Sequence, residues 1–191
     1  MRILFYTITI TLVLFSCGIK NTKAKFQDSK QNNVKTLVCN DTSFVSVFLD
    51  IDFSDEIQIF DKPKGKVIKM LKNNINEQDF IMFGLLEKND SMFCVVVYSS
   101  LDKTFITKGW IFKNNHLGIY SSTYSRNFIL YKTPHNKREI MAIDKEYNPN
   151  MYEVIDFDGK WLKIKTKIKG EKYEGWIPPD EQCSNVYSTC N

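Results

Sequence analysis

Five cysteines and two histidines are the residues of this chain best suited to nucleophilic or metal chemistry. A thiol peptidase needs a cysteine, a histidine that activates it and a third group that orients the histidine. The histidines, His116 and His135, follow Asn114-Asn115 and Pro134, which is typical of surface loops. Cys94 lies in an apolar strand-like run, without a helix N-terminus to lower its pKa. A Cys94–His135 pair is the one catalytic alternative, and the sequence otherwise predicts no catalytic residues and no enzyme.

Metal and phosphate sites find little support in the spacing of the polar residues. Cys183 and Cys190 are separated by six residues with no histidine after them, which favours a disulfide over a zinc site. An acidic cluster lacks the glycine and the later glutamate of a calcium-binding loop, so we interpret it as a solvated loop; its members are Asp50, Asp52, Asp55 and Glu56. No phosphate-binding loop or hydrolase elbow is present in the sequence. We therefore expect neither a metal nor a cofactor.

The N-terminus has the pattern of an export signal. Arg2 precedes thirteen uncharged, mostly apolar residues, Ile3 to Phe15. This run is shorter than the roughly 20 residues that cross a bilayer, and it has the length of a secretory hydrophobic region. It ends in Leu14-Phe15-Ser16-Cys17-Gly18, which resembles the lipobox of bacterial lipoproteins. The resemblance implies a signal peptide over residues 1–16 and lipidation of Cys17; the alternative is a plain signal peptide with a chance cysteine.

The segment after Cys17 is polar. Residues 18–36 are rich in Lys, Asn, Gln and Ser and cannot bury enough apolar surface to fold, so residues 17–38 are predicted to be a flexible, lipidated tether. Removing residues 1–16 removes only Arg2 from the charged residues, and the formal net charge falls from +4 to +3 over 175 residues. So weak a bias, together with export, argues against a nucleic-acid partner. The expected location is the cell envelope, on the periplasmic side or at the surface.

In an oxidising compartment the remaining cysteines can form disulfides. Cys183 and Cys190 could close a small loop, worth roughly 2.5 kcal/mol in the chain-entropy model. Cys94 lies next to Val95 and Val96, where either a buried free thiol or a bond to Cys39 is consistent with the sequence.

Residues 40–182 are predicted to be all-β and to contain an internal repeat. Aromatic residues make up 14% of the chain, and long helical periodicity is absent. An apolar run followed by a lysine and a proline recurs at residues 57–63 and 129–134, followed by a hairpin pattern and a Gly-Trp-Ile motif. The spacing from proline to tryptophan is 47 residues in the first copy and 42 in the second. Two units that match in order and length indicate a duplicated domain.

The second unit, with "DGKWLKIK" followed by "EGWIP", resembles the bacterial SH3 (SH3b) domain family. The tail "GWIPPDEQCSNVYSTC" also resembles the end of a group of SH3b-containing bacterial lipoproteins. The resemblance implies two small SH3-like β-barrels in tandem and no reaction. The expected domains are residues 39–113 and 126–191, the latter with a disulfide tail, joined by a linker over 114–125.

Exposed aromatic side chains are the usual ligand contacts of small barrels. Strand alternation places Leu162 and Ile164 on the inner face, which leaves Trp161 outside among lysines. The alternative is that Trp161 packs against the other barrel or against residues 114–125. The predicted ligand-binding set is Trp161, Tyr131, Tyr147 and Tyr173.

We therefore expect a membrane-anchored binding module, non-catalytic, that holds a cell-wall peptide or an envelope protein. An inhibitor or immunity lipoprotein that blocks an exported toxin or hydrolase is the alternative from another class. A redox role for Cys183 and Cys190 is weaker, because their spacing is not Cys-x-x-Cys. The densest basic stretch, residues 160–172, is interpreted as a solvated strand face.

Overall fold

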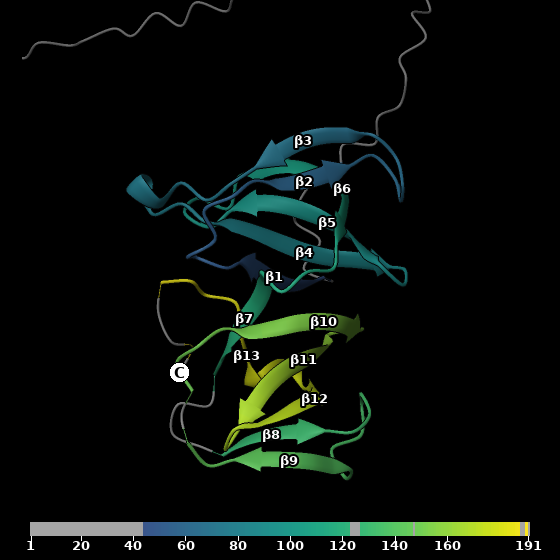
Figure 1. Cartoon of the computed structure of the whole chain (residues 1–191), viewed down its shortest axis with the longest axis vertical. Coiled ribbons are helices and arrows are strands. Elements are labelled where there is room, and N and C mark those ends of the chain that lie inside the picture. The colour runs from purple at the N-terminus through teal and green to yellow at the C-terminus, as the bar shows by residue number, and fades with distance from the viewer. Residues whose placement is uncertain (1–43, 123–126, 147, 188–189, 191) are drawn as a thin grey trace, which may run out of the picture. The chain divides into compact units, whose positions relative to one another are not determined.

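Thirteen β-strands and two short 3₁₀ helices build the part of the chain that the computed structural model describes, residues 44–122, 127–146, 148–187 and 190 (Figure 1). The N-terminal half contains Val45–Leu49 (β1), Ile57–Phe60 (β2), Val67–Leu71 (β3), Ile81–Lys88 (β4), Met92–Ser99 (β5) and Phe105–Phe112 (β6), with the 3₁₀ helix Ile75–Glu77 (η1) after β3. The C-terminal half contains Leu117–Ser121 (β7), Phe128–Tyr131 (β8), Ile140–Asp144 (β9), Tyr152–Asp158 (β10), Trp161–Ile168 (β11) and Glu171–Ile177 (β12). Pro179–Glu181 (η2) and Gln182–Cys183 (β13) follow. The predicted all-β class is confirmed.

The two halves have the same strand order. Along the sheet the N-terminal half runs β3-β2-β6-β5-β4-β1, and the C-terminal half runs β7-β10-β11-β12-β8-β9. Counted outward from the middle, each half therefore places its first, fourth, fifth, sixth, second and third strands in turn. The halves meet where β1 and β7 pair antiparallel, with Phe48 opposite Gly118 and Leu49 opposite Leu117.

The strands form one open sheet. β3 and β9 are the ends of the path, and β13 pairs with β7 off the path. Among the described strands no pairing closes either half into a separate barrel. What the structure shows is thus a continuous antiparallel sheet in which a six-strand order occurs twice.

The predicted linker over residues 114–125 contains a strand. β7 lies within it, and its Leu117 and Ile119 are fully buried. β7 pairs with β1, β10 and β13, so it is the first strand of the C-terminal half. The sequence pattern does not reveal this strand, because the strand is only five residues long and polar residues flank it.

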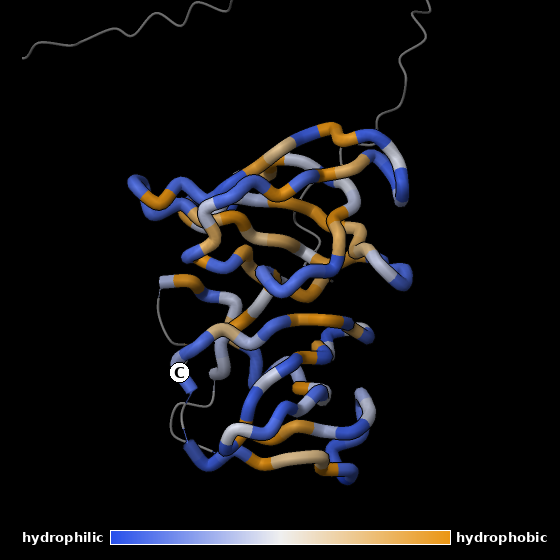
Figure 2. Tube along the Cα trace, in the orientation of Figure 1, coloured by the Kyte–Doolittle hydropathy of each residue, from blue (hydrophilic) through white to orange (hydrophobic). Residues whose placement is uncertain are grey.

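The hydrophobic core follows strand alternation in both halves. Apolar residues gather in the strands and polar residues in the loops (Figure 2). Leu162 and Ile164 are fully buried, as predicted, and they belong to the same core cluster as Phe93 of the N-terminal half. The rings of Phe93 and Phe157 lie 5.7 Å apart between the halves. The two halves therefore share one core.

The Gly-Trp-Ile motifs occupy matching positions in β6 and β12. Trp110 pairs with Phe60 of β2, and Trp176 pairs with Tyr131 of β8. A Cβ atom on Gly109 would lie 2.5 Å from Ile59 Cγ2, so glycine is required for the close approach of β6 to β2. In each half the motif thus marks the point where the sixth strand pairs with the second strand.

Candidate functional site

Trp161, the first candidate for a ligand contact, is buried. It begins β11 and is 7% exposed, so the expectation of an indole open to solvent is wrong. The alternation itself is as predicted, because Leu162 beside it points into the core. The outer face at Trp161 is covered by the loop between β8 and β9, which a strand pattern cannot reveal.

The aromatic neighbours of Trp161 come from β8 and the loop after it. The rings of Tyr131 and Trp161 lie 5.7 Å apart at 74°, and Tyr131 is only 5% exposed. The His135 ring lies 5.7 Å from the indole, and its Nε2 is 3.4 Å from Asp158 Oδ2 at the end of β10. We call these four residues the tryptophan cluster. It brings together two of the predicted residues, and it joins a loop to a turn instead of offering an open platform.

Burial also acts on the hydroxyl of Tyr131. The pKa of Tyr131 is raised, chiefly because desolvation disfavours the phenolate, and Glu181 adds to the shift. The side chain is therefore neutral over the physiological pH range. Its role in the cluster is packing against the indole of Trp161.

Tyr173 lies elsewhere, in the middle of β12, where it is half-buried. Its hydroxyl donates a hydrogen bond to Glu171 Oε2 at 2.9 Å. This hydrogen bond and the charge of Glu171 raise the pKa of Tyr173 above its ordinary value. Tyr147, the fourth predicted residue, lies outside the described residues.

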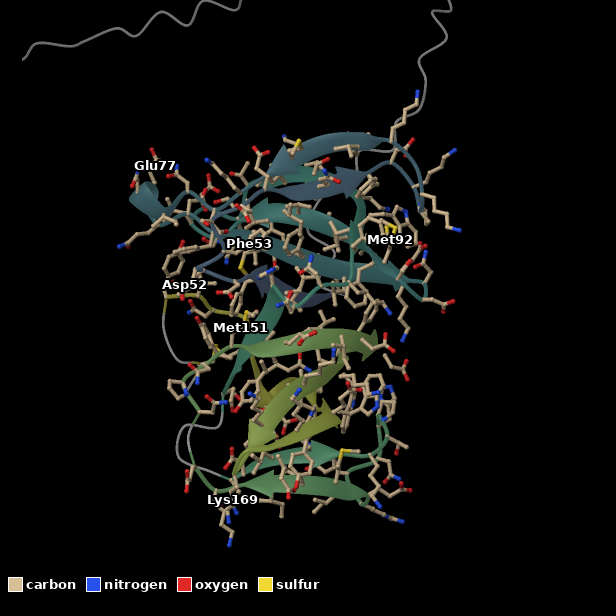
Figure 3. All side chains as sticks on the ribbon, in the orientation of Figure 1. Asp52, Phe53, Glu77, Met92, Met151 and Lys169 are labelled. Atoms are coloured by element: carbon tan, nitrogen blue, oxygen red, sulfur yellow. A yellow bond between two sulfur atoms is a disulfide. The ribbon has the colours of Figure 1, made fainter. Side chains whose placement is uncertain are left out.

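Tyr173 borders a cleft of about 830 Å³ that we call the C-terminal cleft. One wall comes from the end of β9 and the loop before β10, and the other comes from the β11–β12 hairpin. Met151 and Lys169, labelled in Figure 3, belong to the opposite walls. Its lining residues are Asp144, Glu146, Asn148, Pro149, Asn150, Met151, Glu153, Lys165, Thr166, Lys167, Lys169, Lys172, Tyr173 and Glu174.

The two walls differ in charge. Asp144, Glu146 and two asparagines line the loop side, whereas the lysines all lie on the hairpin side. Lys165 is neutralised by Glu153, with 3.2 Å between Nζ and Oε1. Lys167 and Lys172 are directly opposite each other in the β11–β12 ladder, and neither forms an ion pair with a described residue.

Two like charges facing each other across a ladder repel, so a bound anion would relieve this repulsion. The hairpin wall also contains Glu174, whose Oε2 lies 3.7 Å from Lys163 Nζ. A polar volume of this size, with amines mainly on one wall and carboxylates mainly on the other, suits a short ligand that carries both charges. The cleft is the best candidate site in the described part of the chain.

The sequence contained a signal for this site. The lysine-rich pattern of residues 160–172 predicts a solvated face, and in the structure four of these lysines line the cleft. The acidic and amide wall could not be paired with it in advance, because β9 and the loop after it are brought alongside only by the sheet order.

The cysteines divide into three groups. Cys183 and Cys190 form the predicted disulfide, with a Cα–Cα distance of 5.5 Å. Cys94 is a buried free thiol whose pKa is raised by desolvation, and it pairs with Trp110 across the β5–β6 ladder. Cys17 and Cys39 lie outside the described residues.

Neither the histidines nor the acidic residues form a second candidate site in the described part of the chain. His135 contacts Asp158 and Trp161, and the His116 ring lies 4.1 Å from the ring of Phe53 at a tilt of 34°. Within residues 44–187, apart from the gaps at 123–126 and 147, no three His, Cys, Asp or Glu side chains are arranged to hold a metal ion. No helix among the described residues is long and apolar enough to cross a membrane.

The chain was compared with protein-family models, with curated proteins and with solved structures. None of them matches it.

Proposed function

We propose that this protein is a lipid-anchored, non-catalytic binding module of the cell envelope, and that its C-terminal cleft binds a short cell-wall peptide. The observation that carries the proposal is the opposition of charges in the cleft, where Lys167 and Lys172, which form no ion pair with a described residue, face a wall with Asp144 and Glu146. Cell-wall stem peptides combine carboxylates with a free amine or amide. Each end of such a peptide would therefore meet the complementary wall.

We further propose that the two halves are SH3-like barrels derived from one duplicated unit. The identical strand order supports this reading, as do the matching positions of the Gly-Trp-Ile strands. Both halves also place a bulge between their fourth and fifth strands, at Leu85/Glu87 and at Val154/Asp156. A bulge bends and twists a strand, which is how an open sheet coils toward a barrel.

Anchoring through Cys17 is proposed from the sequence of the N-terminus. A diacylglyceryl group would provide the two acyl chains that stable attachment to a membrane requires. The Cys183–Cys190 disulfide is in keeping with an exported chain, because disulfides persist in oxidising compartments.

The test uses residues 38–191, which form one compact unit with all thirteen strands, the core and the disulfide. The protein is incubated with purified peptidoglycan sacculi, and the bound fraction is measured after sedimentation. Lys167→Glu/Lys172→Glu is the cleft variant, and Lys64→Glu/Lys66→Glu on the β2–β3 hairpin is the control with the same change in net charge.

We expect the cleft variant to bind sacculi at least tenfold more weakly than the wild type and the hairpin variant to bind normally. Loss of two charge-assisted contacts of about 1.5 kcal/mol each accounts for that size of effect. Equal binding by all three proteins contradicts the cleft proposal. If the wild type ignores sacculi and cross-linking in cells captures a single exported enzyme, an inhibitory function replaces wall binding.

A further inference from the structure

The hairpin formed by β2 and β3 concentrates positive charge. Residues 61–72 contain five lysines and one acid, Asp61. All five lysine side chains are exposed, and none of them forms an ion pair with a described residue; they are Lys62, Lys64, Lys66, Lys69 and Lys72. The hairpin therefore carries a charge that the described part of the chain leaves uncompensated.

Large apolar side chains project from the same hairpin. Val67, Ile68 and Met70 are 44%, 50% and 49% exposed on β3, which is an edge strand. Val67 and Met70 pair with Phe60 and Gln58, so they share the outer face of the sheet. Ile68 reaches the other face, toward Gly109.

The outer apolar surface continues onto β6. Phe112 is 50% exposed and lies edge-on to Phe60, with ring centroids 5.3 Å apart. We call the hairpin lysines together with Val67, Ile68, Met70 and Phe112 the basic–apolar face. Exposed apolar side chains on both sides of an edge strand are costly in water and indicate an interaction surface.

The tip of the hairpin is held in one conformation. The backbone N–H of Lys66 donates to Asp61 Oδ1 at 2.9 Å, and the N–H of Asp61 donates to the Lys66 carbonyl at 3.1 Å. Gly65 N–H closes the turn on the Lys62 carbonyl at 2.9 Å. The lysines at the tip are thus presented from an ordered turn, and the one acid is occupied within that turn.

The equivalent hairpin of the C-terminal half, β8–β9, has its partners within the chain. Lys137 pairs with Asp180 at 3.0 Å, and His135 lies 3.4 Å from Asp158. The outer aromatic residues there, Tyr131 and Trp161, are buried. The C-terminal hairpin therefore has one of its lysines ion-paired and its aromatic residues covered, although β9 still exposes Ile140, Met141 and Ile143, whereas the N-terminal hairpin has none of its five lysines ion-paired with a described residue.

We propose that the basic–apolar face docks on the surface of an anionic lipid bilayer. Lysine amines would contact lipid phosphates, while Val67, Ile68, Met70 and Phe112 would enter the boundary between headgroups and acyl chains, as in interfacial membrane binding. A fluid headgroup layer can surround both faces of a projecting edge strand, whereas a protein groove would cover mainly one. This geometry favours a bilayer over an acidic protein, and the inference does not depend on the peptide cleft or on lipidation of Cys17.

The test is flotation of residues 38–191, without any lipid modification, with two kinds of vesicle at about 0.15 M salt, where weak surface electrostatics are screened. One vesicle contains phosphatidylglycerol and phosphatidylcholine, and the other contains phosphatidylcholine alone. Lys64→Glu/Lys66→Glu and Met70→Ser/Phe112→Ser alter the proposed face. The cleft variant Lys167→Glu/Lys172→Glu, with the same net charge as the first, is the control.

The wild type is expected to bind the anionic vesicles at least tenfold more strongly than the neutral ones. Each lysine near an anionic surface raises the affinity for the membrane severalfold. Both variants of the face should lose at least tenfold of this binding, and the cleft variant should retain it. Absence of vesicle binding by the wild type overturns the proposal, and so does equal loss in the face and cleft variants. Binding to an acidic peptide in place of vesicles would assign the face to a protein. Sacculus binding reports on the cleft separately, so either proposal can fail alone.

Discussion

Trp161 shows how a single side chain can have the predicted orientation and a different environment. Its neighbours in the strand point into the core, and the indole points away from it, as alternation requires. Tyr131 and His135 nevertheless cover it. We therefore assign it a role in holding the β8–β9 loop against the β10–β11 turn.

Replacing Trp161 with alanine should destabilise the fold by about 3–5 kcal/mol, because truncating a buried aromatic leaves a cavity and uncovers its neighbours. The measurement is the free energy of unfolding from urea denaturation of residues 38–191. Phe105→Ala is the control, since Phe105 is 45% exposed and should cost less than about 1 kcal/mol. A Trp161→Ala protein as stable as the control would show that the indole is not packed.

At the scale of elements, the two Gly-Trp-Ile strands occupy equivalent positions, but they lie at different distances from the neighbouring strand. A Cβ atom on Gly109 would lie 2.5 Å from Ile59 Cγ2 and 2.6 Å from the Phe60 carbonyl oxygen. The nearest atoms to a Cβ on Gly175 are Leu130 Cβ at 3.0 Å and the Tyr131 oxygen at 3.3 Å. β6 therefore approaches β2 more closely than β12 approaches β8.

Gly109→Ala should accordingly destabilise the protein by about 2–3 kcal/mol, since an added methyl in a tight contact forces the backbone to shift. Gly175→Ala should cost about 1 kcal/mol or less, because its neighbours need move only slightly. Paired urea melts of the two variants make the comparison. Equal losses of stability would mean that the β2–β6 and β8–β12 pairs are equally close in solution.

The two edge strands of the sheet also differ between the halves. β3 and β9 hold equivalent places and both expose apolar residues. They differ in what surrounds them, because Asp180 of η2 pairs with Lys137 of the β8–β9 hairpin and Asp158 of β10 contacts its His135, whereas no described acidic side chain pairs with the lysines of the β2–β3 hairpin. Strands at equivalent places in the two halves thus have different surface chemistry.

At the scale of the whole molecule, the two halves are joined by more than the β1–β7 pairing. Lys88 Nζ lies 2.8 Å from Asp156 Oδ1 and donates to the Phe157 carbonyl at 2.5 Å, while Lys113 Nζ is 3.7 Å from the same carboxylate oxygen. These contacts surround the Phe93–Phe157 ring pair in the shared core. The hairpin tip of one half is therefore fixed to the bulged strand of the other.

We expect residues 38–191 to unfold in a single cooperative transition, because one core cluster spans both halves. In differential scanning calorimetry the van't Hoff and calorimetric enthalpies should agree. Gly109→Ala and Gly175→Ala, one in each half, should each lower that one transition. Two separable transitions, each sensitive to only one of the variants, would instead show that the halves fold independently.

Much of the organisation could be predicted from local patterns. The β class follows from composition and alternation, the inward direction of Leu162 and Ile164 follows from the two-residue period, and the close pairing of Cys183 and Cys190 follows from their short separation. The order of motifs around Pro63 and Pro134 likewise runs parallel to the order of strands in the two halves. Each of these properties depends on residues near one another in the chain.

Only the tertiary structure decided which surfaces are covered. Trp161 is buried by a loop that begins about thirty residues earlier, and β7 is a strand because β1 and β10 lie on either side of it. The C-terminal cleft likewise exists because the sheet order places the end of β9 and the loop after it near the β11–β12 hairpin. Periodicity specifies the direction of a side chain relative to its own strand, whereas burial and charge pairing depend on distant segments that the sequence pattern does not position.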